Sequence, residues 1–383
     1  MMKPDEKVRV LVILARMNVG GPAWLASALA DGLPPDGFET LLVCGHVGDD
    51  EADYLEMSGD KTSIYRIDAL GRSIGPLDDL KSFFEIRKII KKFNPHIVHT
   101  HTAKAGFLGR LAAFSARVPV VVHTFHGHLL YGYFSNFTVK AICLIEKVLA
   151  KFSNSLIAVG EKVRDDLLSV GIGDYDKFEV IAPGVETLHS MEKVLIREKF
   201  GLNEDQIVLL FVGRLTKVKR LDRLIEAVRL LKDEFPNLLL LVAGGGDLED
   251  SVREMALDLS SSVEFLGWQE DVSPLYFAAD VIVLSSDNEG MPVSLIEAAM
   301  AGLPAVTTDA GSAREVVVNN KTGLVVEKSS MGLSQGLRLL FADKKYREEM
   351  GQEAKKYAIK SFGKERLITD HSKLYRKLIT SKN

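Results

Sequence analysis

Several features that define other classes of protein are scarce or missing in this 383-residue chain. It has two cysteines, Cys44 and Cys143, in apolar stretches without metal-ligand spacing, so we expect buried thiols and a reducing compartment. No segment approaches the roughly 20 apolar residues of a membrane-spanning helix, and residues 8–14 resemble a strand more than a signal peptide. The formal net charge of -4 provides no basic field for nucleic acid. These absences predict a cytoplasmic protein and leave open peripheral contact with the cytoplasmic face of the inner membrane.

What the chain does contain is a regular alternation of short β-branched runs and amphipathic stretches. Continuous apolar strands separated by helices are typical of a parallel sheet that is covered on both faces. The alternation runs once through the first half and restarts in the second, which predicts an α/β fold of two Rossmann-like domains facing each other across a cleft. The predicted strands are 8–14, 40–44, 64–67, 97–101, 119–125 and 155–159, followed by 207–212, 238–243, 263–266, 280–286, 304–308 and 323–326.

A polar segment between the two series, residues 181–206, begins with a Pro-Gly turn, continues as a polar helix, and is predicted to be an inter-domain linker. We therefore place the N-terminal domain at 1–186 and the C-terminal domain at 187–363. Ligands of such domains bind at the carboxyl ends of the strands.

The first candidate site is a glycine pair, Gly20 and Gly21, between the first strand and a helix expected to start near Trp24. Glycines allow a close approach of the backbone to an anion, and a helix N-terminus supplies free N–H groups. The pair is not part of a GxGxxG motif, so the dinucleotide fingerprint is absent. A simple tight turn explains the residues equally well.

The second candidate site follows the first strand of the second domain. Arg214 and Lys219 lie in a Lys-rich loop that is able to bracket a diphosphate. Cations at this position stabilise the negative charge that a departing nucleoside diphosphate gathers. The alternative is an ordinary exposed basic loop.

The third candidate site is the segment 289–298, after the strand predicted at 280–286. Glu289 is expected in a loop, Pro292 in the first turn of a helix, and Glu297 within that helix. Free amides near Gly290 and Met291 complete a site for ligands rich in hydroxyls. The alternatives are a helix-dipole partner for Glu289 and a solvated helix acid for Glu297.

Together, the Glu-x7-Glu spacing, the Gly-Arg…Lys loop and the early Gly-Gly loop resemble the retaining glycosyltransferases of family 4, which have the GT-B fold. The segment from His99 to Gly106 and the segment 126–128 are similar to a bacterial branch of that family. The resemblance extends from about Val8 to the C-terminus. It implies that the first domain binds the acceptor and the second the nucleotide-sugar donor, and that the helix within 364–383 packs back on the first domain.

The resemblance also implies a role for each candidate residue. Glu297 holds the ribose of the donor nucleotide, Glu289 with the amides of Gly290 and Met291 holds the transferred sugar, and His126 contacts that sugar near the reacting carbon. Arg214 and Lys219 grip the diphosphate with help from the backbone of Gly20 and Gly21. The remaining donor-binding positions are Pro292, Gly244, Gly245 and Gly246, and those suggested for the acceptor are His101 and Lys104.

The implied activity is transfer of a hexosyl or N-acetylhexosaminyl group, with retention, from a nucleotide sugar to a glycan or lipid-linked acceptor in bacterial polysaccharide or glycoconjugate synthesis. UDP is the favoured nucleotide and GDP the next. No metal or other cofactor is expected, because Ser286–Glu289 is not a DxD motif. Two alternatives share the fold, namely a nucleotide-sugar epimerase and a non-catalytic interaction protein.

Two further patterns have competing interpretations. Histidines at positions 99, 101, 123, 126 and 128 suggest a metal, but no carboxylate or cysteine completes a ligand set, so zinc is disfavoured. Basic stripes at 87–92 and at Lys140, Lys147 and Lys151 fit either anionic lipid or a solvated helix face above a core stripe of Ile142, Ile145 and Leu149. The aromatic run 131–134 fits either an acceptor loop or ordinary packing.

Overall fold

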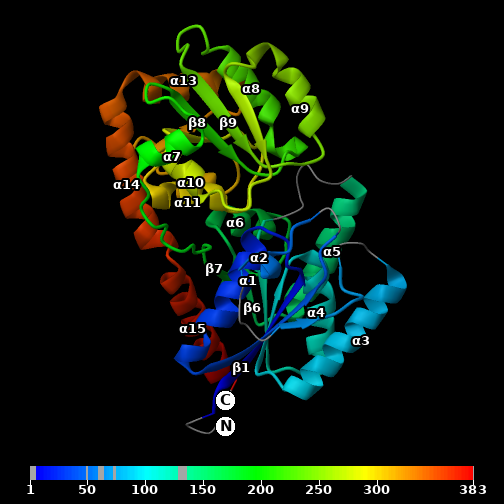
Figure 1. Cartoon of the computed structure of the whole chain (residues 1–383). Helices are drawn as coiled ribbons and strands as arrows, with labels where there is room; N and C mark the ends of the chain where they lie inside the picture. Colours follow the sequence, from blue (N-terminus) through cyan, green and yellow to red (C-terminus); the bar gives the residue numbers. More distant parts are fainter. Residues whose placement is uncertain (1–5, 49–50, 59–63, 72–74, 128–135, 383) are drawn as a thin grey trace. The chain divides into compact units, whose positions relative to one another are not determined.

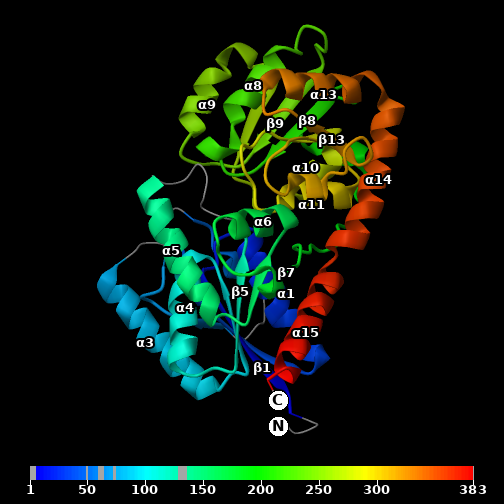
Figure 2. The ribbon, with the colours of Figure 1, turned by 180° about the vertical axis from the view of Figure 1, so that it is seen from behind.

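The computed structural model describes residues 6–48, 51–58, 64–71, 75–127 and 136–382. The chain forms two compact units, one of Met1–Gly184 with Lys364–Asn383 and the other of Val185–Gly363. The division falls close to the boundary predicted at 186, and the C-terminal segment groups with the first unit. Figures 1 and 2 show the chain from opposite sides.

The first unit is built on a parallel sheet of seven strands in the order β3-β2-β1-β4-β5-β6-β7. Its central strands are β-branched and buried on both faces, as a sheet covered by two helical layers requires. The order reverses between β1 and β4, where Val10 pairs with Ile97. The strands are β1 Val8–Arg16, β2 Phe38–Gly45, β3 Ile64–Arg66, β4 Ile97–His101, β5 Val120–Phe125, β6 Ser155–Ala158 and β7 Phe178–Val180.

Two helical layers cover this sheet (Figure 1). Helices α1 and α15 pack on one face with Val10, Val12 and Leu14 of β1, whereas α3 and α4 pack on the other with Leu11 and Ile13. Helix α15 is therefore part of the core of the first unit. The helices are α1 Gly21–Gly32, α2 Tyr54–Ser58, α3 Pro76–Phe93, α4 Ala103–Ser115, α5 Asn136–Phe152, α6 Glu161–Ser169 and α15 Lys364–Thr380.

The second unit repeats the plan with six parallel strands in the order β10-β9-β8-β11-β12-β13. Helices α8, α9, α13 and α14 contribute to one core with Leu209 and Phe211 of β8, while α10 and α11 contact strands β8 and β11. The strands are β8 Ile207–Val212, β9 Leu238–Ala243, β10 Val263–Gly267, β11 Val281–Leu284, β12 Ala305–Thr308 and β13 Gly323–Val326. The helices are α7 Lys193–Lys199, α8 Leu221–Arg229, α9 Glu249–Met255, α10 Ser273–Ala278, α11 Val293–Ala301, α12 Ala313–Val316, α13 Ser330–Ala342 and α14 Lys344–Phe362.

These two covered parallel sheets confirm the predicted pair of Rossmann-like domains. Two local predictions were wrong, and one strand was missed. Helix α1 begins at Gly21 rather than near Trp24, because Pro22 already fits its first turn. Pro292 lies just before α11 with an extended ψ of 103°, so it precedes the first turn instead of occupying it. The short strand β7 was missed because its three residues carry little hydrophobic pattern.

The predicted linker contains the expected helix, which packs against the second unit. Its helix α7 is fastened to the second unit by Arg197, whose guanidinium donates to Asp280 Oδ2 over 2.6 Å and to the carbonyl of Ala278 over 2.9 Å. Lys193 donates to the other carboxylate oxygen of Asp280 over 2.7 Å. Arg197 is buried, which was not expected in a linker.

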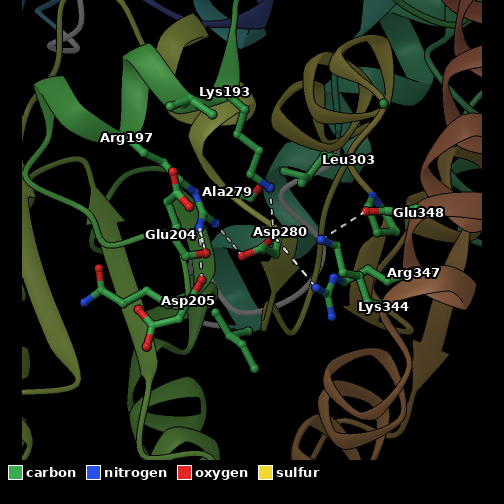
Figure 3. A pocket seen from close by; sticks show the side chains of 15 residues that line it. Lys193, Arg197, Glu204, Asp205, Ala279, Asp280, Leu303, Lys344, Arg347 and Glu348 are labelled. Carbon is green, nitrogen blue, oxygen red and sulfur yellow. Dashed lines mark hydrogen bonds and ion pairs between the residues drawn. The ribbon is translucent and has the colours of Figure 1, made fainter.

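These side chains line a cavity of about 520 Å³ (Figure 3). Ile207 starts β8, Asp280 precedes β11 and Pro304 precedes β12, so the cavity lies at the amino ends of the strands. The predicted site residues of this unit lie at the opposite edge of the sheet. The cationic side chains around Asp280 therefore serve to hold α7 and α14 in place, and the cavity is not the expected nucleotide site.

Candidate functional site

The candidate site of the second unit lies where its strand order reverses. Strands β8 and β11 are neighbours, with Val281 paired to Leu209. Their carboxyl ends lead into the loop that contains Arg214 and Lys219 and the loop that contains Glu289. Open parallel sheets bind ligands at such a reversal, because the two loops leave in opposite directions and open a crevice.

Lys219 and Glu289 meet directly at this point. The ammonium of Lys219 lies 2.7 Å from Glu289 Oε1, and both side chains are largely buried. The hydroxyl of Ser286 donates to the same oxygen over 2.5 Å. The two motifs that were recognised separately in the sequence therefore form a single polar cluster in which the carboxylate is already oriented.

Arg223 of α8 helps to hold the loop after β8 and the loop after β11 together. Its buried guanidinium donates to the carbonyl oxygen of Ser285 and to Asp287 Oδ1, both over 2.7 Å. The amide of Asp287 donates to the carbonyl of Val218 over 2.9 Å. Because a buried Arg with paired donors fixes both chain segments, the distance between Lys219 and Glu289 is set by the fold rather than by their own flexible side chains.

The glycine run after β9 packs against the Arg214 loop. At Gly244, where φ is 136°, an added Cβ would lie 2.1 Å from the carbonyl oxygen of Gly213. The amide of Leu215 donates to the carbonyl of Gly245 over 2.9 Å. Gly244 is thus needed for close packing of the two loops, which is a structural reason for a glycine that the sequence assigned to ligand binding. Gly245 and Gly246 lie in the same loop.

Glu297 occupies a separate position in α11. The hydroxyl of Tyr276, from α10, donates to Glu297 Oε2 over 2.7 Å. Burial raises the pKa of Glu297 to about 7, although the hydrogen bond from Tyr276 acts in the opposite direction. The carboxyl group therefore titrates near neutral pH and gains its charge readily when a ligand donates hydrogen bonds to it.

The other predicted donor residues surround these groups. Arg214 is exposed in the loop after β8, whereas Met291 and Pro292 are buried and Gly290 is partly buried. An added Cβ on Gly311, where φ is 53°, would lie 1.8 Å from the carbonyl of Glu289. The loop after β12 therefore supports the backbone of the Glu289 loop from the side.

In the first unit, the glycine pair lies at the start of α1, and Gly21 is the first residue of the helix. Gly20 caps the helix, accepts a hydrogen bond from the amide of Trp24 over 3.2 Å, and is followed by Gly21 and then Pro22 in the first turn. No side chain of the described residues caps this helix end. Its first amides are thus available to an anion, which is compatible with the predicted role and equally with a turn.

His126 lies after β5 and contacts a second histidine. Its Nε2 lies 3.0 Å from Nδ1 of His101, a fully buried residue at the end of β4. Nε2 of His101 is buried and has no hydrogen-bond partner in the described part of the chain. A proton on that atom would be unsatisfied, so the favoured tautomer of His101 carries its proton on Nδ1 and donates it to His126.

The remaining imidazoles continue this arrangement into the core. His101 stacks on His99 with ring centroids 4.1 Å apart, and His99 bonds Tyr375 of α15 over 2.6 Å and Thr124 over 2.7 Å. His371, also of α15, packs on His99 at 5.8 Å.

The buried surroundings favour the neutral form of each ring in this group. Burial lowers the pKa of His126 to about 3 and that of His371 to about 4, and it holds the pKa values of His99 and His101 well below the usual range. The group is therefore uncharged at neutral pH. No set of three or more potential ligands within the described residues forms a metal site.

The two suggested acceptor residues are less accessible than expected. His101 is fully buried beneath His126, and the ammonium of Lys104 lies 2.7 Å from Asp79 of α3 with little exposed surface. A role for either in acceptor binding stays a prediction. His128 and the aromatic run 131–134 lie outside the described residues.

Four residues of these clusters were not found from the sequence. Arg223 and Tyr276 lie in helices among apolar residues, and their partners are distant in the chain. His371 and Tyr375 form an i, i+4 pair of polar aromatics on the apolar face of α15. That spacing was the available signal, because two such residues on a buried stripe require partners.

Two family models match the chain. The model described as "Glycosyltransferase Family 4" matches residues 19–188, and "Glycosyl transferases group 1" matches residues 192–357. The putative glycosyltransferase EpsD of Bacillus subtilis is 30% identical over 78% of this chain and 80% of its own length. The UDP-Gal:alpha-D-GlcNAc-diphosphoundecaprenol alpha-1,3-galactosyltransferase of Escherichia coli is 28% identical over 91% of this chain and 92% of its own.

Solved structures agree in fold. Anabaena HepE, solved in complex with UDP and glucose, has a TM-score of 0.83 at 20% identity and covers 97% of this chain and 100% of its own. The class defined by the fold and the site is thus a GT-B protein with polar loops at both points where the strand order reverses. The chain belongs to the family 4 glycosyltransferases, as the sequence motifs predicted.

Proposed function

We propose that the chain transfers a hexosyl or N-acetylhexosaminyl group from a UDP-sugar to a lipid-linked or polysaccharide acceptor in bacterial glycan synthesis, with retention of configuration. The observation that carries the proposal is the cluster of Lys219, Glu289 and Ser286 where the strand order reverses. It joins a cation suited to a diphosphate with a carboxylate suited to sugar hydroxyls. The names of the Escherichia coli relative and of the HepE complexes support UDP as the nucleotide.

The proposed binding roles follow from the chemistry of each side chain. Glu297 accepts hydrogen bonds from the ribose hydroxyls, and Glu289 accepts them from the transferred sugar, assisted by the amides of Gly290 and Met291. Arg214 and Lys219 neutralise the leaving diphosphate, so that these side chains fill the role a metal ion has in other transferases. The neutral ring of His126 hydrogen-bonds the donor sugar without adding a charge.

In the proposed reaction the bond between the anomeric carbon and the diphosphate oxygen breaks. A bond from the acceptor hydroxyl oxygen to that carbon forms on the same face. The hydroxyl proton passes to the departing diphosphate. A second enzyme carboxylate flanking the sugar is not needed, in contrast to retaining glycosidases. The reaction requires the diphosphate to be held firmly, which explains why cations and not a general base dominate the loop after β8.

The proposed acceptor and location follow the relatives. The Escherichia coli relative is named for a diphosphoundecaprenol acceptor, and the capsular glycosyltransferase CapM of Staphylococcus aureus for polysaccharide biosynthesis. We propose a cytoplasmic protein that works at the inner membrane surface. No described helix is both long and apolar enough to cross a bilayer.

The test is to incubate the protein with UDP-glucose, UDP-galactose and their N-acetylated amines, each with an undecaprenyl-diphosphate sugar, and to follow UDP release. The anomeric configuration of the product is read by NMR. The proposal predicts UDP release with one donor and an α-linked product from the α-linked donor. Matched assays with and without EDTA test the proposed independence from metal.

Other outcomes contradict the proposal in separable ways. A β-linked product would overturn retention. Conversion of the UDP-sugar to its epimer without transfer would indicate an epimerase of the same fold. Absence of nucleotide binding with every donor would favour a non-catalytic protein.

A further inference from the structure

Helix α5 of the first unit turns one face inward and is held there by a buried ion pair. Glu146 accepts hydrogen bonds from Arg110 of α4 over 2.8 Å and 2.7 Å. Arg110 is fully buried and also donates to the carbonyl of Gly106. Leu149 and Ala150 are buried on the same side of α5. This pair fixes the rotation of the helix about its axis, and thereby decides which residues face outward.

The outward face of α5 is apolar rather than polar. Leu144, Ile145, Val148 and Phe152 follow the i, i+1, i+4, i+8 spacing of one helical stripe, and they are 65%, 44%, 46% and 40% exposed. The sequence suggested a core stripe that includes Ile145. In the structure Leu149 is buried but Ile145 is exposed, so a second apolar stripe exists in addition to the one that covers the sheet.

Helix α4 extends this surface. Phe107 and Phe114 lie two helical turns apart and are 39% and 57% exposed. The rings of Phe114 and Phe152 have centroids 4.5 Å apart, and the two helices are in contact. We call this surface the α4–α5 face. It consists of Phe107, Phe114, Leu144, Ile145, Val148 and Phe152.

A row of lysines borders the α4–α5 face. Lys140, Lys147 and Lys151 are exposed and lie on one side of the apolar stripe of α5. The only carboxylate within α4 and α5 is Glu146, which is buried and bound to Arg110. The exposed charges of the described part of α5 are therefore all positive.

We propose that the α4–α5 face docks the protein on a bilayer that contains anionic lipid. An amphipathic helix with a basic border lies in the plane of the interface, with its apolar residues among the acyl chains and its cations at the lipid phosphates. Lys140, Lys147 and Lys151 supply that border, and Leu144, Val148 and Phe152 the inserted side chains.

The charge pattern argues against a second copy of this chain as the occupant. A twofold interface brings the same patch of both copies together. Two α4–α5 faces would contribute the same ammonium groups and no exposed carboxylate to neutralise them. An anionic bilayer supplies the missing negative charge, and it also accepts the apolar stripe. The inference rests on the proposed function in one respect, because an enzyme with a lipid-linked acceptor must reach that acceptor at the bilayer surface.

The experiment is sedimentation of the full chain with vesicles of phosphatidylcholine alone or of equal parts phosphatidylcholine and phosphatidylglycerol. The apolar variant is L144Q/V148Q and the charge variant is K147E/K151E; all these positions are exposed, so folding is preserved. Matched controls from the second unit are L257Q and K345E, since Leu257 is 73% exposed and the Lys345 side chain 86% exposed. Thermal stabilisation by UDP is recorded for every variant.

We expect binding to the vesicles with phosphatidylglycerol, weaker binding at high salt, and weak binding to phosphatidylcholine alone. Each variant should reduce the partition coefficient, the apolar one by about tenfold or more because two side chains lose their burial. Both controls should bind as the wild type does.

Absence of vesicle binding by the wild type overturns the inference, as does equal binding by both test variants. A dimer in sedimentation velocity that L144Q/V148Q disrupts would assign the face to a second copy instead. Vesicle binding without stabilisation by UDP would leave the docking surface standing and contradict the proposed function. Stabilisation by UDP without vesicle binding would support the proposed function and overturn the docking surface.

Discussion

The two units share a sheet topology but place opposite kinds of polar group at the ends of their strands. In the second unit the groups around the loops after β8 and β11 are paired charges, with Lys219 on Glu289 and Arg223 of α8 on Asp287. In the first unit the ends of β4 and β5 carry His101 and His126, which burial keeps neutral. The same backbone plan thus supports a charged site and an uncharged one.

The difference teaches how each kind of site is held. Charged side chains are fixed by partners of opposite sign from the neighbouring loop, so both partners must be present. Imidazoles are fixed by hydrogen bonds and stacking that reach as far as Tyr375 in the last helix. A substitution in the charged site of the second unit leaves a charge without its partner. The histidine group of the first unit is instead disrupted by acid, which protonates the buried rings.

The largest expected effect is on stability at the amino ends of the strands of the second unit. Asp280→Ala leaves the buried Arg197 and its neighbour Lys193 without their carboxylate. Removing one partner of a buried pair costs about 3–5 kcal/mol. Urea unfolding measures this change. Asp258→Ala removes an exposed carboxylate from the partly exposed Arg229 and should change little. An equal loss of stability in both variants would show that burial is not what matters.

The next effect is on turnover. Glu289→Gln keeps the shape of the side chain but removes the charge that faces Lys219. We expect UDP release to slow by about 10²–10³-fold, the usual consequence of losing one group that stabilises the transition state. Arg214→Ala should also slow transfer more than it weakens nucleotide binding. Glu353→Gln, on an exposed face of α14, is the control, and unchanged turnover in Glu289→Gln would contradict the assigned role.

The sequence predicted both sheets and the positions of Glu289, Lys219 and Glu297, because each follows a strand with a clear apolar pattern. It did not predict how the loops are joined. Arg223 acts through Ser285 and Asp287, and His99 through a tyrosine at the far end of the chain, so their partners are set by tertiary packing. The sequence also did not predict which apolar residues are exposed to solvent. Ile145 and Leu149 of α5 were expected in one core stripe, but Ile145 is exposed and Leu149 is buried.

A smaller effect per pH unit is expected from acid on the first unit. The pKa of His126 is lowered to about 3 and that of His371 to about 4, whereas both rings protonate near pH 6.5 in an unfolded chain. Their contribution to stability is therefore fully present above about pH 6.5 and is lost as the pH falls towards the folded values. Each such histidine lowers stability by about 1.4 kcal/mol per pH unit within that window.

The measurement is urea unfolding at a series of pH values. His371→Leu should reduce the slope of the unfolding free energy against pH by the contribution of one protonating group. This change in slope is separate from any effect of the substitution on stability at neutral pH. A slope that survives in His371→Leu would assign the acid sensitivity to other groups.

The smallest effect concerns nucleotide affinity. Because the pKa of Glu297 is about 7, its carboxylate is the minor form below neutral pH. If the ionised form holds the ribose, affinity for UDP should rise by up to about tenfold between about pH 6 and 8. Glu297→Gln should bind UDP more weakly and should lack the part of the pH dependence that comes from Glu297. The pH dependence that remains in this variant is that of the nucleotide itself, and it is subtracted. Isothermal titration calorimetry measures both.

The most direct test of the central claim, that the second unit holds a UDP-sugar through Glu297 and the Lys219 cluster, is thermal unfolding with UDP, GDP and ADP in turn. A nucleotide at about 100 times its dissociation constant adds about 2.7 kcal/mol to stability. The account predicts that UDP raises the unfolding midpoint, that the other two raise it less, and that Glu297→Ala reduces the shift. No shift with any nucleotide, or an equal shift in the Glu297→Ala variant, would contradict it.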